Sequence, residues 1–121
     1  MKNFAYWIYI EKEILDLVDV FSKLFQVNDF VRDYEDTWEW IAGNSLWLKA
    51  KINVSRKHNW KTGEYHEPLS ISIDFEDEIG EATIDLLGVL LSTELKAKVF
   101  FGDIKPLTGT NHEYLEKKVF E

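Results

Sequence analysis

The sequence predicts an α+β fold, in which an antiparallel sheet of four to five strands packs on two main helices in a ferredoxin-like split β-α-β arrangement. Three observations support this prediction. An aromatic-rich apolar run leads into a helical pattern, two alternating segments follow, and a second helical pattern precedes a last apolar run. With 121 residues, 45% of them hydrophobic, and no cysteine, the chain is expected to form one domain, residues 1–121, without disulfides or thiolate chemistry.

Residues 4–10 predict the first strand, because seven apolar residues stand in a row and would line both of its faces. Such a strand is expected at the centre of the sheet or covered on both sides. A helix follows, since apolar residues recur at three- and four-residue spacing before Asn28 and Asp29 end the pattern. Its apolar stripe consists of Ile14, Leu17, Val18, Phe21, Leu24 and Phe25.

Residues 30–41 fit two structures. They can form a helical stripe, or residues 37–41 can form a strand that leads into a tight turn at Gly43 and Asn44. We favour the hairpin, because residues 46–55 then alternate cleanly between apolar and polar side chains, as a strand with one buried face does. That buried face is expected to consist of Leu46, Leu48, Ala50, Ile52 and Val54.

The second half of the chain predicts a hairpin tip at residues 56–67, a return strand at 69–76 and a second helix that begins near Asp77 as its N-cap. Gly80 and Gly88 are expected inside this helix, where they would allow close packing on the sheet. The expected core face consists of Ile79, Ala82, Thr83, Leu86, Leu87 and Leu90. Residues 99–102 predict a further strand, and residues 111–120 form either a short helix or an edge strand.

The charge of the chain is concentrated in one segment. Residues 74–94 contain seven carboxylates and no Lys or Arg, so they carry −7 of the formal net charge of −8. An acidic surface of this kind is typical of a domain that binds a basic partner. The alternative is a solvated outer helix face, although a purely structural helix would gain from a Lys among its acids. The candidate binding residues are Asp74, Glu76, Asp77, Glu78, Glu81 and Asp85.

Aromatic residues are the second candidate. If Leu46 and Leu48 face inward, Trp47 faces outward and can anchor an interface together with the acids. Trp7, Tyr9 and Phe100 fit the same outward face. The alternative is a small cluster that the C-terminal segment covers, with a lid of Tyr114, Leu115, Val119 and Phe120.

Other chemistry has little support in the sequence. The basic tip at residues 56–61 surrounds Trp60 and fits a nucleic-acid contact, but a net charge of −8 disfavours binding to nucleic acid and to anionic membranes. The histidines His58, His66 and His112 form no compact ligand motif, so we expect no metal and no cofactor. Without a phosphate-binding glycine loop or a nucleophile motif, we expect no enzymatic activity. No apolar stretch approaches the roughly 20 residues of a membrane helix, so the chain is expected to be soluble and cytoplasmic.

The segments FAYWIYIEKEILDLVDVF and LWLKAKINVSRKHNW…PLSISIDFEDEIGEATIDLL, in a small acidic chain without cysteine, resemble the immunity proteins of bacterial toxin systems, including those of contact-dependent growth inhibition. The resemblance implies that the partner is the C-terminal domain of a cognate toxin, often a basic nuclease. It also implies neutralisation by covering the toxin's active site or substrate surface, without chemistry. Two alternatives remain: an RNA- or nucleotide-binding module that uses the sheet face, and a small-molecule-binding or enzymatic domain of the same fold.

Overall fold

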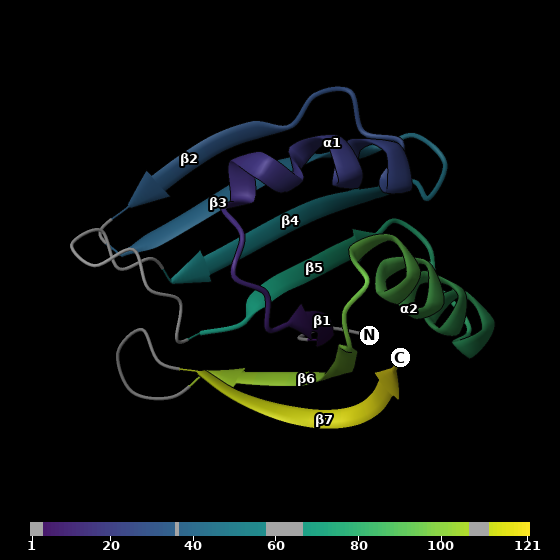
Figure 1. Cartoon of the computed structure of the whole chain (residues 1–121). Coiled ribbons are helices and arrows are strands. Elements are labelled where there is room, and N and C mark those ends of the chain that lie inside the picture. Colours follow the sequence, from purple (N-terminus) through teal and green to yellow (C-terminus); the bar gives the residue numbers. More distant parts are fainter. Residues whose placement is uncertain (1–3, 36, 58–66, 107–111) are drawn as a thin grey trace.

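The computed structural model describes residues 4–35, 37–57, 67–106 and 112–121. Seven strands form one antiparallel sheet in the order β2-β3-β4-β5-β1-β6-β7, with two helices packed on it (Figure 1). The strands are β1 (Phe4–Ile8), β2 (Val31–Glu35), β3 (Trp38–Ser45), β4 (Ala50–Lys57), β5 (Leu69–Phe75), β6 (Val99–Pro106) and β7 (His112–Phe120), and the helices are α1 (Ile14–Phe25) and α2 (Glu81–Leu95). The α+β class is confirmed. Seven strands exceed the four to five predicted, and the ferredoxin-like arrangement is not confirmed.

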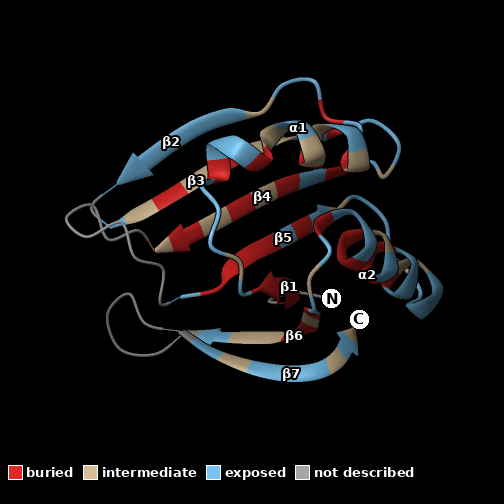
Figure 2. Ribbon diagram, viewed as in Figure 1, coloured by how far each residue is buried: buried red, intermediate tan, exposed pale blue. Residues whose placement is uncertain are grey.

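The first strand is central, as its two apolar faces predict. β1 pairs with β5 on one side and with β6 on the other, and all five of its residues are buried (Figure 2). The Tyr6 hydroxyl donates a hydrogen bond of 2.6 Å to the Ile84 carbonyl of α2. Burial raises the pKa of Tyr6, so this hydroxyl stays a donor and ties the strand to the helix above it.

Helix α1 also matches its prediction, because Ile14, Leu17, Phe21 and Phe25 face the core. The helix ends at Phe25, before the predicted Asn28 and Asp29, since Gln26 takes a left-handed conformation with φ 52° and caps it.

The predicted hairpin is confirmed by β3 and β4, but its turn is misplaced, and the strand β2 that precedes it was not predicted. Gly43 and Asn44 lie inside β3, and the turn to β4 comes later, at residues 46–49. Lys49 adopts φ 52° in this turn, and Leu46 is 66% exposed instead of buried. The alternating pattern is therefore correct only from Ala50 onward.

The return strand is confirmed as β5, which pairs with β4 from Ser70 to Phe75. The predicted hairpin tip, with Trp60, His58 and His66, lies largely outside the described residues. The C-terminal segment is an edge strand, β7, as one of its two predicted forms.

Helix α2 begins at Glu81, later than the predicted Asp77, because Gly80 is extended and occupies the N-cap. Its predicted core face is wrong in part. Leu87 is buried, but Leu86 is 50% exposed, because α2 is rotated relative to the prediction. The buried face consists of Ile84, Leu87, Gly88, Leu91, Ser92 and Leu95.

Close packing at Gly88 accounts for this rotation. A Cβ at Gly88 would lie 2.3 Å from the Phe120 ring of β7, so only glycine lets the strand approach the helix here. The predicted role of Gly88 is therefore confirmed, whereas Gly80 precedes the helix and packs against nothing within 4 Å.

Three charged side chains, Arg32, Glu39 and Arg56, connect β2, β3 and β4 to the segment that leads into α1. Glu39 and Arg56 are register partners on β3 and β4, and each is only 1% exposed. Arg32 Nε donates to Glu39 Oε2 at 2.7 Å, and the Arg56 guanidinium donates to the carbonyls of Ile10 and Lys12. Arg56 thereby fixes the connection between β1 and α1 against the sheet. In the described part of the chain, no helix is long and apolar enough to cross a membrane.

Candidate functional site

The predicted acids lie at one end of the sheet and along the start of α2. Asp74 is the second-last residue of β5. Glu76, Asp77 and Glu78 lie in the loop that follows, and α2 carries the last two, Glu81 and Asp85. All six side chains are exposed. The loop lies beside the turn between β3 and β4, because the Glu76 amide donates a hydrogen bond of 3.1 Å to the Lys49 carbonyl.

Trp47 lies in that same turn between β3 and β4. Its indole Nε1 donates to the Leu24 carbonyl at 3.2 Å, and the neighbouring Leu46 amide donates to the Gln26 carbonyl at 3.0 Å. Both bonds pin the turn to the end of α1. Trp47 is nevertheless 39% exposed and Leu46 is 66% exposed, and both belong to the turn whose Lys49 carbonyl is bonded to the acidic loop.

The acids differ in how they are paired. Lys118 of β7 forms ion pairs with Glu81 Oε2 at 2.9 Å and with Asp85 Oδ1 at 2.8 Å. The hydrogen bonds that the Lys118 ammonium donates to Asp85 and Glu81 raise its pKa above the ordinary value. The acidic helix face therefore does have a cation, although it comes from a strand far along the chain.

The other four acids, Asp74, Glu76, Asp77 and Glu78, have no ion-pair partner among the described residues. The last carbonyls of α1, at the same end of the sheet, add the partial negative charge of a helix C-terminus. We call this surface the acidic end, defined by Leu46, Trp47, Asp74, Glu76, Asp77 and Glu78.

The outer face of α2 carries two exposed apolar side chains, Leu86 and Val89. Leu86 is 50% exposed and Val89 is 53% exposed on the turns that follow Glu81 and Asp85. Sequence reasoning missed this patch because it assigned Leu86 to the core. The available signal was the apolar character of α2 on all sides, which is typical of a helix covered on more than one face.

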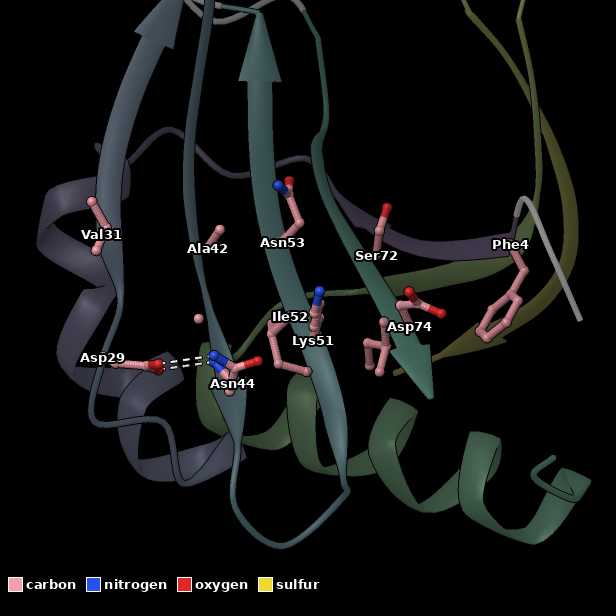
Figure 3. Close-up of a pocket in the computed structure, with 12 residues that line it drawn as sticks. Phe4, Asp29, Val31, Ala42, Asn44, Lys51, Ile52, Asn53, Ser72 and Asp74 are labelled. Carbon is pink, nitrogen blue, oxygen red and sulfur yellow. Dashed lines mark hydrogen bonds between the residues drawn. The ribbon is translucent and has the colours of Figure 1, made fainter. Parts of the chain in front are cut away.

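The sheet face opposite the helices carries a groove of about 850 Å³ (Figure 3). Its floor is a row of short side chains that are register partners across three strands, Ala42, Asn53 and Ser72. The next row along the strands consists of Asn44, Lys51 and Asp74. We call this hollow the open-face groove. The sequence predicted Lys51, Asn53, Ser72 and Asp74 on polar strand faces but Asn44 in a turn, and it gave no means to align the strands.

One wall of the open-face groove is fixed by a double hydrogen bond. The Asn44 amide and its Nδ2 donate to the two carboxylate oxygens of Asp29, each at 2.9 Å, as Figure 3 shows. These bonds lower the pKa of Asp29 below its ordinary value. Gly43 makes the close approach possible, because a Cβ there would lie 2.5 Å from Val27 and 3.0 Å from Asp29.

The outward aromatics form the small cluster that was the alternative interpretation. Trp7 stacks on Phe100 at 6.2 Å between ring centroids and meets Tyr114 of β7 at 5.1 Å. Tyr9 meets Phe100 edge-on, and Trp7 is only 3% exposed. Burial raises the pKa of Tyr114 to about 12. The predicted lid is correct for Tyr114 alone, since Phe120 packs toward Tyr6 and Gly88 while Leu115 and Val119 remain exposed.

No group of three or more His, Cys, Asp or Glu side chains that could hold a metal is present within the described ranges. His58 and His66 fall outside those ranges.

No protein family, no curated protein and no solved structure matches this chain.

Proposed function

We propose that this protein binds and neutralises a basic partner protein through the acidic end, as an immunity protein does with its cognate toxin domain. The observation that carries the proposal is that two hydrogen-bonded segments at one end of the sheet carry the exposed, oriented Trp47 and four exposed acids that have no ion-pair partner among the described residues. An apolar centre with a charged rim is the usual anatomy of a protein interface.

Each part of the acidic end has a separate role in this binding mode. Buried tryptophans are common hot spots, and truncating one costs about 2 kcal/mol or more of binding free energy. Carboxylates at the rim accelerate encounter with a basic partner and exclude acidic ones. Leu86 and Val89 extend the apolar area along α2.

The toxin class of the partner rests on the resemblance to immunity proteins. A nuclease surface built for phosphates is positively charged, so a carboxylate array is complementary to it. Covering that surface neutralises the toxin without any chemistry by the inhibitor.

The burial of Trp7 argues against RNA binding through the outward aromatic cluster. A stacking platform needs accessible ring faces, whereas Trp7 is 3% exposed and packs against Phe100 and Tyr114.

We also propose that four central strands retain the split β-α-β plan. The order β4-β5-β1-β6 is antiparallel throughout, α2 lies between β5 and β6 in the chain, and α1 lies between β1 and β4. The hairpin of β2 and β3 and the edge strand β7 would then be additions to that plan.

The proposal is tested by a charge reversal that avoids the acids paired with Lys118. Cells would express the toxin domain encoded immediately upstream together with wild-type protein or the variant Asp77→Lys plus Glu78→Lys. We expect the variant to lose protection, because it replaces two rim acids with cations that repel the partner.

The matched control is Glu113→Lys plus Glu116→Lys, which changes the net charge equally at two exposed positions of β7. This control is expected to protect like the wild type. Full protection by Asp77→Lys plus Glu78→Lys, or no protection by the wild type, would contradict the proposal.

A further inference from the structure

We propose that the open-face groove binds an extended peptide segment that carries a Lys or Arg side chain. This inference rests on the proposed function, because we assign the segment to the same basic partner that contacts the acidic end.

The shape of the groove follows from the register of the strands. Ala42, Asn53 and Ser72 are short and stand side by side on β3, β4 and β5. Val31 of β2, which is exposed, and Phe4 of β1, which is only 7% exposed, also line the groove, from strands on either side of this row (Figure 3). A trough with a floor of small side chains and apolar residues at its margins can hold an extended chain.

The floor offers hydrogen bonds that are unused in the described residues. The side chains of Asn53 and Ser72 have no hydrogen-bond partner there. An amide and a hydroxyl can each donate and accept, so they match the alternating N–H and C=O groups of a peptide backbone.

The charges select a cationic side chain. Lys51 and Asp74 are register partners, yet no ion pair joins them, and both side chains are exposed. Asp74 can therefore receive a Lys or Arg of the segment, while Lys51 can donate to a backbone carbonyl. The acids of the loop from Glu76 to Glu78 follow Asp74 directly and extend the attraction for a basic chain.

The groove continues toward the acidic end. A second hollow of about 340 Å³ is lined by Leu46 and Glu76 and shares Asn44, Lys51 and Asp74 with the groove. A small molecule is normally enclosed over most of its surface, whereas a linear ligand can follow two open hollows that share a wall. The double hydrogen bond between Asp29 and Asn44 holds that wall in place before binding.

The test uses a phage-displayed library of random heptapeptides selected on the full chain. Selected peptides are synthesised, and their Kd is measured by fluorescence anisotropy. We expect peptides with a Lys or Arg next to an apolar residue. Ser72→Trp fills the groove at an exposed strand position and should weaken binding by about tenfold or more. Asp74→Asn should weaken only the basic peptides, by roughly tenfold.

Two controls separate the groove from the rest of the surface. Glu113→Trp introduces the same ring at an exposed position of β7 and should leave the Kd unchanged. Asp77→Lys plus Glu78→Lys changes the loop and should weaken peptide binding far less than Ser72→Trp does. Failure to select any peptide, or equal binding by Ser72→Trp and wild type, would overturn the groove proposal.

The two proposals fail in different assays. If Ser72→Trp abolishes peptide binding while the loop variant still protects cells, the groove is a peptide site and the acidic end is not the toxin interface. If Ser72→Trp binds peptides like the wild type while the loop variant loses protection, the groove proposal is wrong and the acidic end stands.

Discussion

The two helices pack on the same sheet, but different interactions determine which face of each helix is buried. Helix α1 has one apolar stripe, and its buried residues Ile14, Leu17, Phe21 and Phe25 follow from spacing alone. Helix α2 has apolar residues on every side, so its spacing allows several core faces. Contacts with β7 select one of them, through Phe120 at Gly88 and Lys118 at Glu81 and Asp85.

The two helices also differ in how much apolar surface they leave exposed near charged residues. Helix α1 leaves one large apolar side chain exposed, Leu15 at 57%, and it lies outside the apolar stripe that the core buries. Helix α2 keeps Leu86 and Val89 in solvent beside an acidic loop, which the core does not require. Apolar surface that folding leaves exposed is a marker of interaction sites.

The largest expected effect separates two neighbouring leucines of α2. Leu87 is fully buried, so Leu87→Ala should reduce the free energy of unfolding by about 2–5 kcal/mol. Leu86 is 50% exposed, so Leu86→Ala should change the free energy of unfolding by only about 0.5 kcal/mol. Urea denaturation of both variants measures the difference. Equal losses would show that α2 is rotated toward the face that its sequence pattern first indicated.

A smaller effect is expected at Gly88, where two terms oppose each other. Alanine favours a helix by about 1 kcal/mol over glycine, but its Cβ would lie 2.3 Å from the Phe120 ring. Overpacking of this kind costs about 1–3 kcal/mol, so Gly88→Ala should be destabilising in thermal unfolding. Adding Phe120→Leu to Gly88→Ala should recover part of the lost thermal stability, because the smaller side chain makes room for the Cβ. A gain in Tm for Gly88→Ala alone would mean that β7 does not press on α2.

The smallest effect is expected for Lys118→Met, which removes the cation between Glu81 and Asp85. The Tm should fall slightly, and the difference from wild type should shrink as salt is added. The pKa of Lys118 is raised in the folded state, so its contribution is complete below the ordinary value of 10.5 and is lost as the pH rises through the higher folded pKa. A difference in Tm between wild type and variant that persists unchanged at pH 12 would contradict the ion pairs.

Much of the fold was predictable because it depends on local pattern. The central position of β1 followed from its two apolar faces, and α1 followed from its stripe. The start of β4 was not predictable in the same way, because Leu46 and Leu48 continue its alternation into the turn. The hydrogen bonds from Leu46 and Trp47 to the end of α1 hold the chain in that turn, and they join residues that are about 20 positions apart in sequence.

The candidate site was predictable in composition but not in arrangement. The acids were visible as a run without Lys or Arg, yet Lys118 lies 33 residues from Asp85 in sequence and pairs with it in space. The open-face groove depends on the register that aligns Ala42, Asn53 and Ser72, and no local pattern encodes that register.

The most direct test of the acidic end is a kinetic measurement with the proposed partner, for which the C-terminal domain of the protein encoded immediately upstream would be immobilised. Surface plasmon resonance would compare wild type, Trp47→Ala, and Asp77→Lys plus Glu78→Lys, each checked for folding by circular dichroism. We expect Trp47→Ala to raise the dissociation rate by roughly 30-fold, as the loss of a hot spot does. The charge variant should mainly slow association and flatten its dependence on salt. Unchanged rate constants for both variants would contradict binding through the acidic end.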